Sequence, residues 1–197
     1  LNDTHVYVGS DESTSGVMQG ELLADALKKD GQTEAHYFML KGTEGLLHTT
    51  ARSEDVIATL QKNGITAEEA IPAIDCDFSR SVALEKVNAL LANGADFSKV
   101  DTIISNNDDM ALAAARTAKD NPNYAKTIFL GFDGQKSACE AVAAGELTMT
   151  AAQNNFDIGY KAVETIVKIL NGEEYGDVDT GTEIITKDNA QARLDNF

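Results

Sequence analysis

The sequence predicts an α/β protein built on a doubly wound parallel sheet with helices on both faces. Three observations support this prediction. Apolar runs of strand length alternate with segments of helical period, glycines stand where those helices would end, and two apolar runs stop abruptly in amide and carboxylate side chains. Successive strand–helix units give a parallel sheet, because right-handed crossovers return each strand beside the previous one.

Five strand–helix units follow one another from the start of the chain. The predicted strands are His5–Gly9, Ala35–Leu40, Ile71–Asp75, Thr102–Ser105 and Thr127–Leu130. The helices predicted to follow them are Thr14–Lys29, Thr50–Asn63, Ser81–Asn93, Asp108–Asp120 and Gln135–Ala144. Gly64, Gly94 and Gly145 come directly after three of these helices, where a C-terminal glycine cap is expected.

The pattern changes in the last quarter of the chain. Leu147–Ala152 is predicted as a strand, Phe156–Leu170 as a long helix, Gly172–Gly181 as an acidic connector and Glu183–Thr186 as a strand. The long helix carries apolar side chains on or near one face, namely Ile158, Ala162, Val163, Ile166 and Ile169. Such a stripe must be covered by another surface.

Composition excludes several classes of function. With 16 Lys and Arg against 32 Asp and Glu, the net charge of −16 opposes binding to nucleic acid or to an anionic membrane surface. No apolar run is long enough to span a bilayer. Cys76 and Cys139 form no zinc motif, and a core of this size needs no disulfide. The chain begins at Leu1 without an initiator Met or a signal peptide, so we expect a processed or truncated product.

Candidate binding residues follow the strand ends. Asn107 and Asp108 come after one apolar run and Asp133 after another, where open α/β sheets bind ligands in a crevice. No glycine run that could cradle phosphate accompanies them. These short, acceptor-rich side chains suit a neutral ligand covered in hydroxyl groups.

Arg52 and His48 precede or begin the second predicted helix. A cation in the first turn of a helix is unfavourable because it opposes the helix dipole. An arginine at position 52 therefore suggests a further role, such as binding vicinal hydroxyls or a carboxylate. The alternative is a solvated surface arginine. His48 could donate to a ligand or simply be exposed.

Several of the candidate residues also have a structural interpretation. Phe78 could stack on a sugar ring or close the sheet edge as a core residue. Asp108 is most simply the N-cap of its helix, which leaves Asn107 free to point into the crevice. Asp133 could bind a ligand or cap the following helix, and Gln153 ends a strand where the pattern changes.

Catalysis receives little support from the sequence. The chain contains none of the sequence motifs of serine hydrolases, zinc proteases or P-loop nucleotide-binding proteins. Asp108 and Asp133 could act as an acid–base pair, but nothing marks either as poised for it. We therefore expect a protein that is not an enzyme; an enzyme of flavodoxin-like fold is the third and weakest alternative.

Taken in order along the whole chain, these motifs resemble the type I periplasmic sugar-binding proteins of ABC importers, especially the ribose-binding and galactose/glucose-binding branches. The resembling segments are Tyr7–Asp11 with Gly16 and Gly20, Leu40–Arg52, Asp77–Phe78, Ile104–Ala111, Gly131–Gly134 and Ala152–Ala162. Because the segments keep the family order, the resemblance is more specific than any single motif.

The resemblance implies a role for each candidate. Arg52 would hydrogen-bond sugar hydroxyls, Phe78 would stack on the ring, Asn107 and Asp133 would grip the hydroxyl rim, and Gln153 would be the hinge-side glutamine of the ribose branch. The loop before Arg52 departs from the galactose/glucose branch, since only His48 could supply a polar contact there. The calcium loop of that branch is broken at Ala26 and Lys28, so the resemblance implies no metal and no cofactor.

The resemblance also predicts the domain organisation. Residues 1–151 and 181–197 would form the C-terminal sugar-binding lobe. Residues 152–180 would form a hinge crossing and a helix that belongs to an otherwise missing N-terminal lobe. That lobe, or a second copy of the chain, would cover the helix at 156–170.

Two functions of different classes remain open. The leading one is an extracytoplasmic solute-binding protein, in the periplasm or lipid-anchored at the cell surface, that captures a monosaccharide (hexose or pentose) by closure of two lobes. It would present the sugar to an ABC transporter permease, without binding nucleic acid or spanning the membrane itself. The alternative is the effector-binding core of a sugar-responsive transcriptional repressor, which would dimerise and carry a DNA-binding head upstream.

Overall fold

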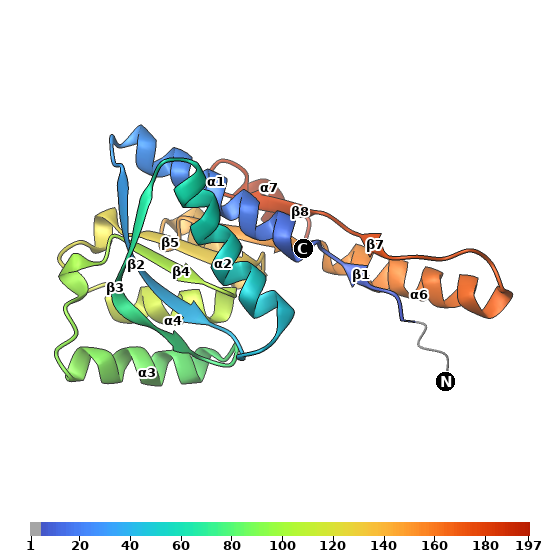
Figure 1. Cartoon of the computed structure of the whole chain (residues 1–197), viewed down its shortest axis with the longest axis horizontal. Coiled ribbons are helices and arrows are strands. Elements are labelled where there is room, and N and C mark those ends of the chain that lie inside the picture. Colours follow the sequence, from blue (N-terminus) through green and yellow to red (C-terminus); the bar gives the residue numbers. More distant parts are fainter. Residues whose placement is uncertain (1–4) are drawn as a thin grey trace.

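The computed structural model describes residues 5–197 and contains one large sheet covered by helices on both faces (Figure 1). The sheet has six strands in the order β3-β2-β4-β5-β6-β8, and only β8 runs antiparallel to its neighbour. Its strands are β2 (Glu34–Lys41), β3 (Thr66–Asp75), β4 (Thr102–Ser105), β5 (Ile128–Asp133), β6 (Met149–Gln153) and β8 (Thr182–Ile185). The predicted doubly wound α/β class is confirmed.

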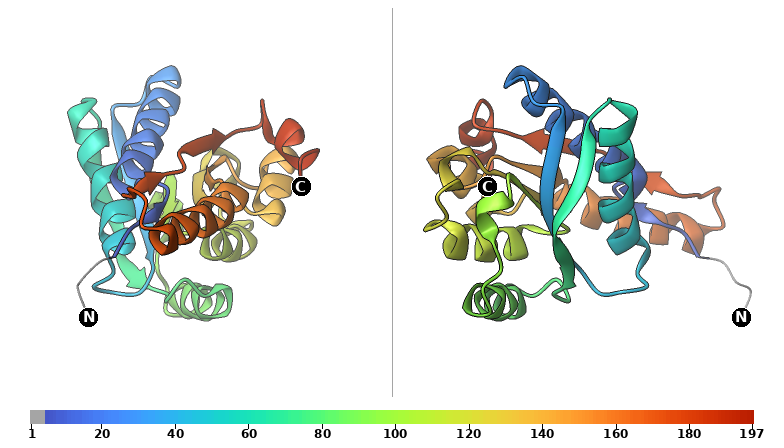
Figure 2. Two further views of the ribbon diagram at one scale, coloured as in Figure 1. Left: turned by 90° about the vertical axis from the view of Figure 1, so that its right-hand side faces the viewer. Right: turned by 60° about the vertical axis from the view of Figure 1, so that its left-hand side comes forward.

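Helices cover both faces of this sheet: α1 and α2 pack on one face, and α3, α4 and α5 pack on the other (Figure 2). The helices are α1 (Glu12–Lys29), α2 (Leu47–Lys62), α3 (Arg80–Ala92), α4 (Asp108–Ala118), α5 (Lys136–Ala144), α6 (Asn155–Asn171) and α7 (Ala190–Leu194). Two short 3₁₀ turns, Phe97–Lys99 and Tyr124–Lys126, precede β4 and β5. Gly64, Gly94 and Gly145 have φ near +80° after α2, α3 and α5, as the glycine pattern predicted.

Adjacent residues of each central strand enter opposite halves of the core, because side chains alternate across a strand. In β4, Ile103 joins the cluster beneath α3, α4 and α5, whereas Ile104 joins the cluster beneath α1 and α2. Phe38 and Met39 divide in the same way in β2. Strands buried on both faces therefore read as continuous apolar runs rather than as alternating ones.

The first predicted strand does not join this sheet. The strand that forms there, β1, is short (Val8–Gly9) and pairs with β7 (Val178–Asp179), which lies in the connector where no strand was predicted. The Asp177 side chain fixes this pairing by accepting a hydrogen bond from the Tyr7 backbone N–H at 2.8 Å. The main sheet therefore begins with β2, and the first helix has no sheet strand before it.

Other boundaries also differ from the sequence prediction. The helices α1 and α2 begin at Glu12 and Leu47, two and three residues earlier than predicted. Strand β3 begins at Thr66 rather than Ile71, because an edge strand can carry exposed charges such as Glu68 and Glu69 on its outer side. The short helix α7 has no counterpart in the prediction.

The unit formed by β1, α6 and β7 projects from the end of the main body (Figure 1). Only Thr165 of α6 is buried, while several large apolar side chains of the helix are at least half exposed: Phe156, Tyr160, Val163, Ile166, Val167 and Leu170. The exposed surface is wider than the predicted stripe. Whether residues 152–180 belong to a different lobe from the main body stays a prediction.

Cys76 and Cys139 are free and buried on the main body. Burial raises the pKa of the Cys76 thiol to about 11, which keeps it protonated and unreactive. Among the described helices, none combines the length and the apolar character needed to cross a membrane.

A pH-sensitive contact lies at the amino ends of β2 and β4, at the other end of these strands from the candidate binding residues. His36 in β2 approaches Asp101 with Nδ1 3.0 Å from Oδ2, and Glu34 and Glu68 lie about 4 Å from Nε2. The hydrogen bond to Asp101 raises the pKa of His36, against a lowering by burial. The protonated ring therefore stabilises the fold below the unfolded-state pKa of about 6.5, and this contribution is lost as the pH rises through the folded-state value.

We predict that His36→Gln removes this pH dependence. The difference in melting temperature between the native chain and the variant should be largest near pH 5.5 and should shrink by pH 8.5. Thermal unfolding followed by circular dichroism across that range measures it. A difference that stayed constant with pH would show that the imidazolium makes no such contribution.

Candidate functional site

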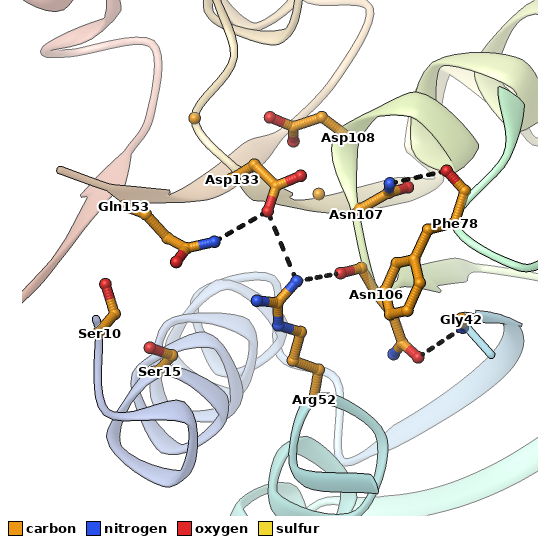
Figure 3. Close-up of polar contacts among 12 residues, drawn as sticks. Ser10, Ser15, Gly42, Arg52, Phe78, Asn106, Asn107, Asp108, Asp133 and Gln153 are labelled. Atoms are coloured by element: carbon orange, nitrogen blue, oxygen red, sulfur yellow. Dashed lines mark hydrogen bonds and ion pairs between the residues drawn. The ribbon is translucent and has the colours of Figure 1, made fainter. Parts of the chain in front are cut away.

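The candidate site lies at the carboxyl ends of the parallel strands, where the loops after β2, β4, β5 and β6 meet. Figure 3 shows Arg52, Asp133 and Gln153 pointing toward one another across this edge. Gln153 Nε2 donates to Asp133 Oδ1 at 3.0 Å, and Arg52 Nη1 lies 3.5 Å from the same oxygen. The structure therefore brings together three of the residues singled out from the sequence.

Arg52 is held by more groups than the sequence suggested. Its side chain is 6% exposed, Nη1 donates to the Asn106 carbonyl at 3.0 Å, and the guanidinium carbon lies 3.6 Å from the centre of the Phe132 ring. The interpretation as a solvated surface arginine is wrong. The dipole argument also fails, since α2 begins at Leu47 and places Arg52 beyond the first turn.

Glu12 is a site residue that sequence reasoning missed. Its two carboxylate oxygens accept from Arg52 Nε at 2.8 Å and from Arg52 Nη2 at 2.9 Å. This bidentate pair has the fork geometry of the strongest arginine–carboxylate contacts. The sequence offered one signal for its position. Asp11 is an N-cap residue whose side chain accepts from Thr14 N, and this places Glu12 in the first turn of α1.

The aromatic group of the site consists of Phe78 and His48. Their ring centroids lie 5.1 Å apart, and the Phe78 ring covers Gly42 so closely that a Cβ there would lie 2.0 Å from Cζ. His48 lies in the first turn of α2 rather than in a loop. Phe78 is only partly buried and also packs against the large core cluster, so the ring has both a core contact and an accessible part.

The structure reverses the roles predicted for Asn107 and Asp108. Asn107 is the N-cap of α4, with Oδ1 accepting from Met110 N at 3.0 Å, and its Nδ2 donates to the Phe78 carbonyl at 3.1 Å (Figure 3). Contrary to the sequence prediction, Asn107 is therefore not free, because its Oδ1 and one N–H of its Nδ2 are engaged within the protein. Its role toward a ligand stays a prediction. Asn106, which sequence reasoning passed over, joins the loop after β2 by accepting from Gly42 N.

Asp108 ties three strand ends together inside the protein. It accepts from Thr150 Oγ1 at 2.7 Å and from the Gln135 backbone N–H at 2.8 Å, and it is fully buried. Burial raises the pKa of this carboxyl to about 8, although both hydrogen bonds act in the opposite direction. Gly131 allows the approach, since a Cβ there would lie 2.2 Å from Asp108 Oδ1. Asp108 is thus a positioning residue rather than a helix cap.

The Asp133 carboxyl is largely buried and interacts with the Arg52 guanidinium and the Gln153 amide. Burial raises the pKa of its carboxyl, while the Arg52 guanidinium and the Gln153 amide lower it. Asp133 does not cap α5, whose N-cap is Gln135 without a side-chain capping bond.

Backbone strain also marks this edge of the sheet. In the described part of the chain, the non-glycine residues with positive φ are Asp77 at 51°, Phe78 at 56° and Asp133 at 114°. Two of these are candidate binding residues, and the third is the neighbour of Phe78. Such conformations are costly and concentrate at functional sites, which independently supports this edge as the binding region.

The chemistry available here is hydrogen bonding to a polar ligand, with an apolar face beside it. Carboxylate and amide groups of Asp133 and Gln153 offer acceptors and donors, and the Phe78 ring offers an apolar face. Residues 5–197 contain no group of three or more histidine, cysteine or acidic side chains arranged to hold a metal ion.

Comparison with known proteins identifies the family. Residues 2–174 match the periplasmic binding protein domain. The D-galactose/methyl-galactoside binding periplasmic protein of Haemophilus influenzae is 31% identical over 176 residues, covering 85% of this chain and 51% of that protein. The ribose import binding protein of the same organism is 32% identical over 168 residues, covering 85% of this chain and 53% of that protein.

Solved structures agree with this assignment. An ABC transporter solute binding protein from Bacillus halodurans with bound myo-inositol superposes with a TM-score of 0.85 at 25% identity, covering 98% of this chain and 64% of that one. A periplasmic solute binding protein from Actinobacillus succinogenes with bound D-allose gives a TM-score of 0.81 at 22% identity, covering 95% and 64%. The chain therefore belongs to the periplasmic binding protein family, and it spans about half the length of the curated relatives it matches.

We predict that Gly131→Ala destabilises the protein by about 2 to 4 kcal/mol, because the new methyl group displaces the buried Asp108 carboxylate from its partners. Chemical denaturation measures the change. Gly159→Ala is the control: it lies in helix α6 with open space around the new Cβ, so it should not destabilise. An unchanged midpoint for Gly131→Ala would contradict the role given to Asp108.

Proposed function

We propose that the chain is the sugar-binding half of an extracytoplasmic solute-binding protein that captures a monosaccharide for an ABC importer without chemically altering it. The observation that supports this most is the cluster of Arg52, Asp133 and Gln153 at the strand ends, with the Phe78 ring beside it (Figure 3). Relatives named for galactose and ribose binding support the ligand class.

The binding roles follow from the contacts. Asp133 carries a carboxylate whose Oδ1 accepts from Arg52 and Gln153 and whose Oδ2 accepts from Gln135 at 3.5 Å, so Oδ2 keeps a lone pair for a sugar hydroxyl. Gln153 shares that carboxylate and is the last residue of β6, so it belongs to the main body and stands directly before the crossing to α6, where the proposed hinge would begin. Phe78 would cover the C–H face of the ring. Asn107 acts on the ligand indirectly, by holding the Phe78 backbone.

Lobe closure completes the proposal. The main body presents one wall of a crevice, and buried sugar hydroxyls without partners would be costly, so a second wall must supply the remaining hydrogen bonds. We infer that a complementary lobe provides it and also covers α6. The relatives reported above are binding proteins, which does not favour the alternative of a repressor core.

The test of the function is titration of the polypeptide expressed from its complete gene with D-galactose, D-glucose and D-ribose by calorimetry. Asp133→Ala should weaken binding of the sugar that binds by about 2 kcal/mol, or roughly thirtyfold, because a charge-assisted hydrogen bond in a closed site is lost. Asp109→Asn is the control, since Asp109 pairs with Arg80 rather than with the cluster. Equal affinity in Asp133→Ala would remove that residue from the site, and failure of all sugars to bind would contradict the function.

A second prediction concerns the uncovered face of α6. In the isolated 197-residue chain, Val163 and Ile166 are 62% and 55% exposed, so we expect two copies to associate through this face. Replacing both by Asp should give a monomer by sedimentation velocity while leaving the melting temperature of the main body unchanged. A native chain that sediments as a monomer, with α6 resistant to proteolysis, would contradict the prediction.

A further inference from the structure

The contact that dominates the candidate site is the ion pair between Glu12 and Arg52. Both contacts of the pair are shorter than 3 Å, whereas Asp133 lies 3.5 Å from the same guanidinium. The side chains are 14% and 6% exposed, so solvent screens the pair only weakly. Glu12, rather than Asp133, is therefore the principal partner of the arginine.

This pairing limits what Arg52 can offer to a ligand. A guanidinium has five N–H groups in a fixed plane. Within residues 5–197, two go to Glu12, one to the Asn106 carbonyl and one to Asp133, which leaves one for a ligand. A single N–H can bind a hydroxyl oxygen. It cannot form the two parallel hydrogen bonds by which an arginine grips a carboxylate or a phosphate.

The balance of charged side chains around Arg52 also disfavours an anionic ligand. Two carboxylates, those of Glu12 and Asp133, face one guanidinium. More negative charge lies where α1 begins, because Asp11 N donates to the Asp179 carboxylate at 3.1 Å. The nearby Arg193 is directed elsewhere, to the Gln153 carbonyl and to Glu183. An anionic ligand would enter a field of its own sign.

We propose that Glu12 is a specificity-determining residue that restricts this site to uncharged sugars and polyols and rejects sugar acids and sugar phosphates. The inference rests on the proposed sugar-binding function and adds to it the residue that selects the ligand by its charge. An acidic first-turn residue also suits the helix dipole of α1, and that structural role alone would leave ligand charge without effect. The two roles therefore separate in a binding experiment.

The experiment compares matched neutral and anionic ligands on the polypeptide expressed from its complete gene. Calorimetry is performed with D-galactose and D-galacturonate, D-glucose and D-glucuronate, and D-ribose and D-ribose 5-phosphate. Variants are Glu12→Gln, which removes the charge, and Glu12→Asp, which keeps it. The control Asp25→Asn removes an exposed carboxylate in the same helix, 13 residues away. That spacing is roughly 20 Å, beyond the Debye length in physiological salt.

We expect the native protein and Asp25→Asn to bind a neutral sugar and to reject its anionic counterpart. Glu12→Gln should raise the affinity for the anionic member by about tenfold or more relative to the neutral one, because the Arg52 fork becomes available. Glu12→Asp should retain the rejection. If Glu12→Gln does not fold by circular dichroism, Glu12→Ala replaces it in the same comparison.

Three outcomes would overturn the inference. If Glu12→Gln leaves the ratio of affinities unchanged, Glu12 only supports Arg52 and the start of α1. If it strengthens neutral and anionic ligands equally, Glu12 competes with every ligand for Arg52 instead of selecting by charge. If the native protein binds a neutral sugar and its anionic partner equally well, the charge selection does not exist. Failure of the native protein to bind any of these sugars would instead contradict the proposed function itself.

Discussion

Burial of the Arg52 guanidinium is the constraint on which the rest of the candidate site depends. A cation that is 6% exposed must be paired, since desolvation is costly and a lost partner would leave an uncompensated charge. The partners come from three parts of the chain: Glu12 from α1, the Asn106 carbonyl after β4, and Phe132 and Asp133 from β5. Arg52 itself lies in α2. One side chain thus fixes the relative positions of the segments that carry the candidate site.

The main body and the projecting unit are stabilised to different extents. The six-stranded sheet is buried on both faces, and Asp108 cross-links three of its strand ends through Thr150 and the Gln135 backbone. The helix α6, by contrast, contacts β1 and leaves Leu170 80% exposed. The candidate binding residues therefore sit on the more extensively buried part, and Gln153 lies next to the crossing to α6. Such a division suits a binding site that closes about a hinge.

The sequence predicted the class of fold and most of its elements because strands buried on both faces and helices ending in glycine leave clear local patterns. The prediction that His5–Gly9 joins the main sheet was wrong for a non-local reason. The strand that pairs with β1 lies 170 residues away, in a connector with no strand pattern of its own. Three of the candidate residues, Arg52, Asp133 and Gln153, do meet at the carboxyl ends of the strands, and their part in ligand binding stays a prediction. The exchange of roles between Asn107 and Asp108 could not be predicted. Both are short polar residues at the start of the same helix, and only tertiary contacts determine which of them caps the helix and which is buried beneath it.

Glu12 shows why the ligand's charge is harder to predict than the ligand's general chemistry. A strand-end position and an acceptor-rich side chain are local properties, and they suffice to suggest a hydroxyl-bearing ligand. The pairing of Glu12 with Arg52 joins residues 40 positions apart on two helices, and nothing in either helix indicates it. Yet this pair decides how many hydrogen bonds the arginine has left and what net charge faces the crevice. Two chains with the same Arg52, Asp133 and Gln153 would therefore differ in ligand charge if only the residue opposite the guanidinium changed.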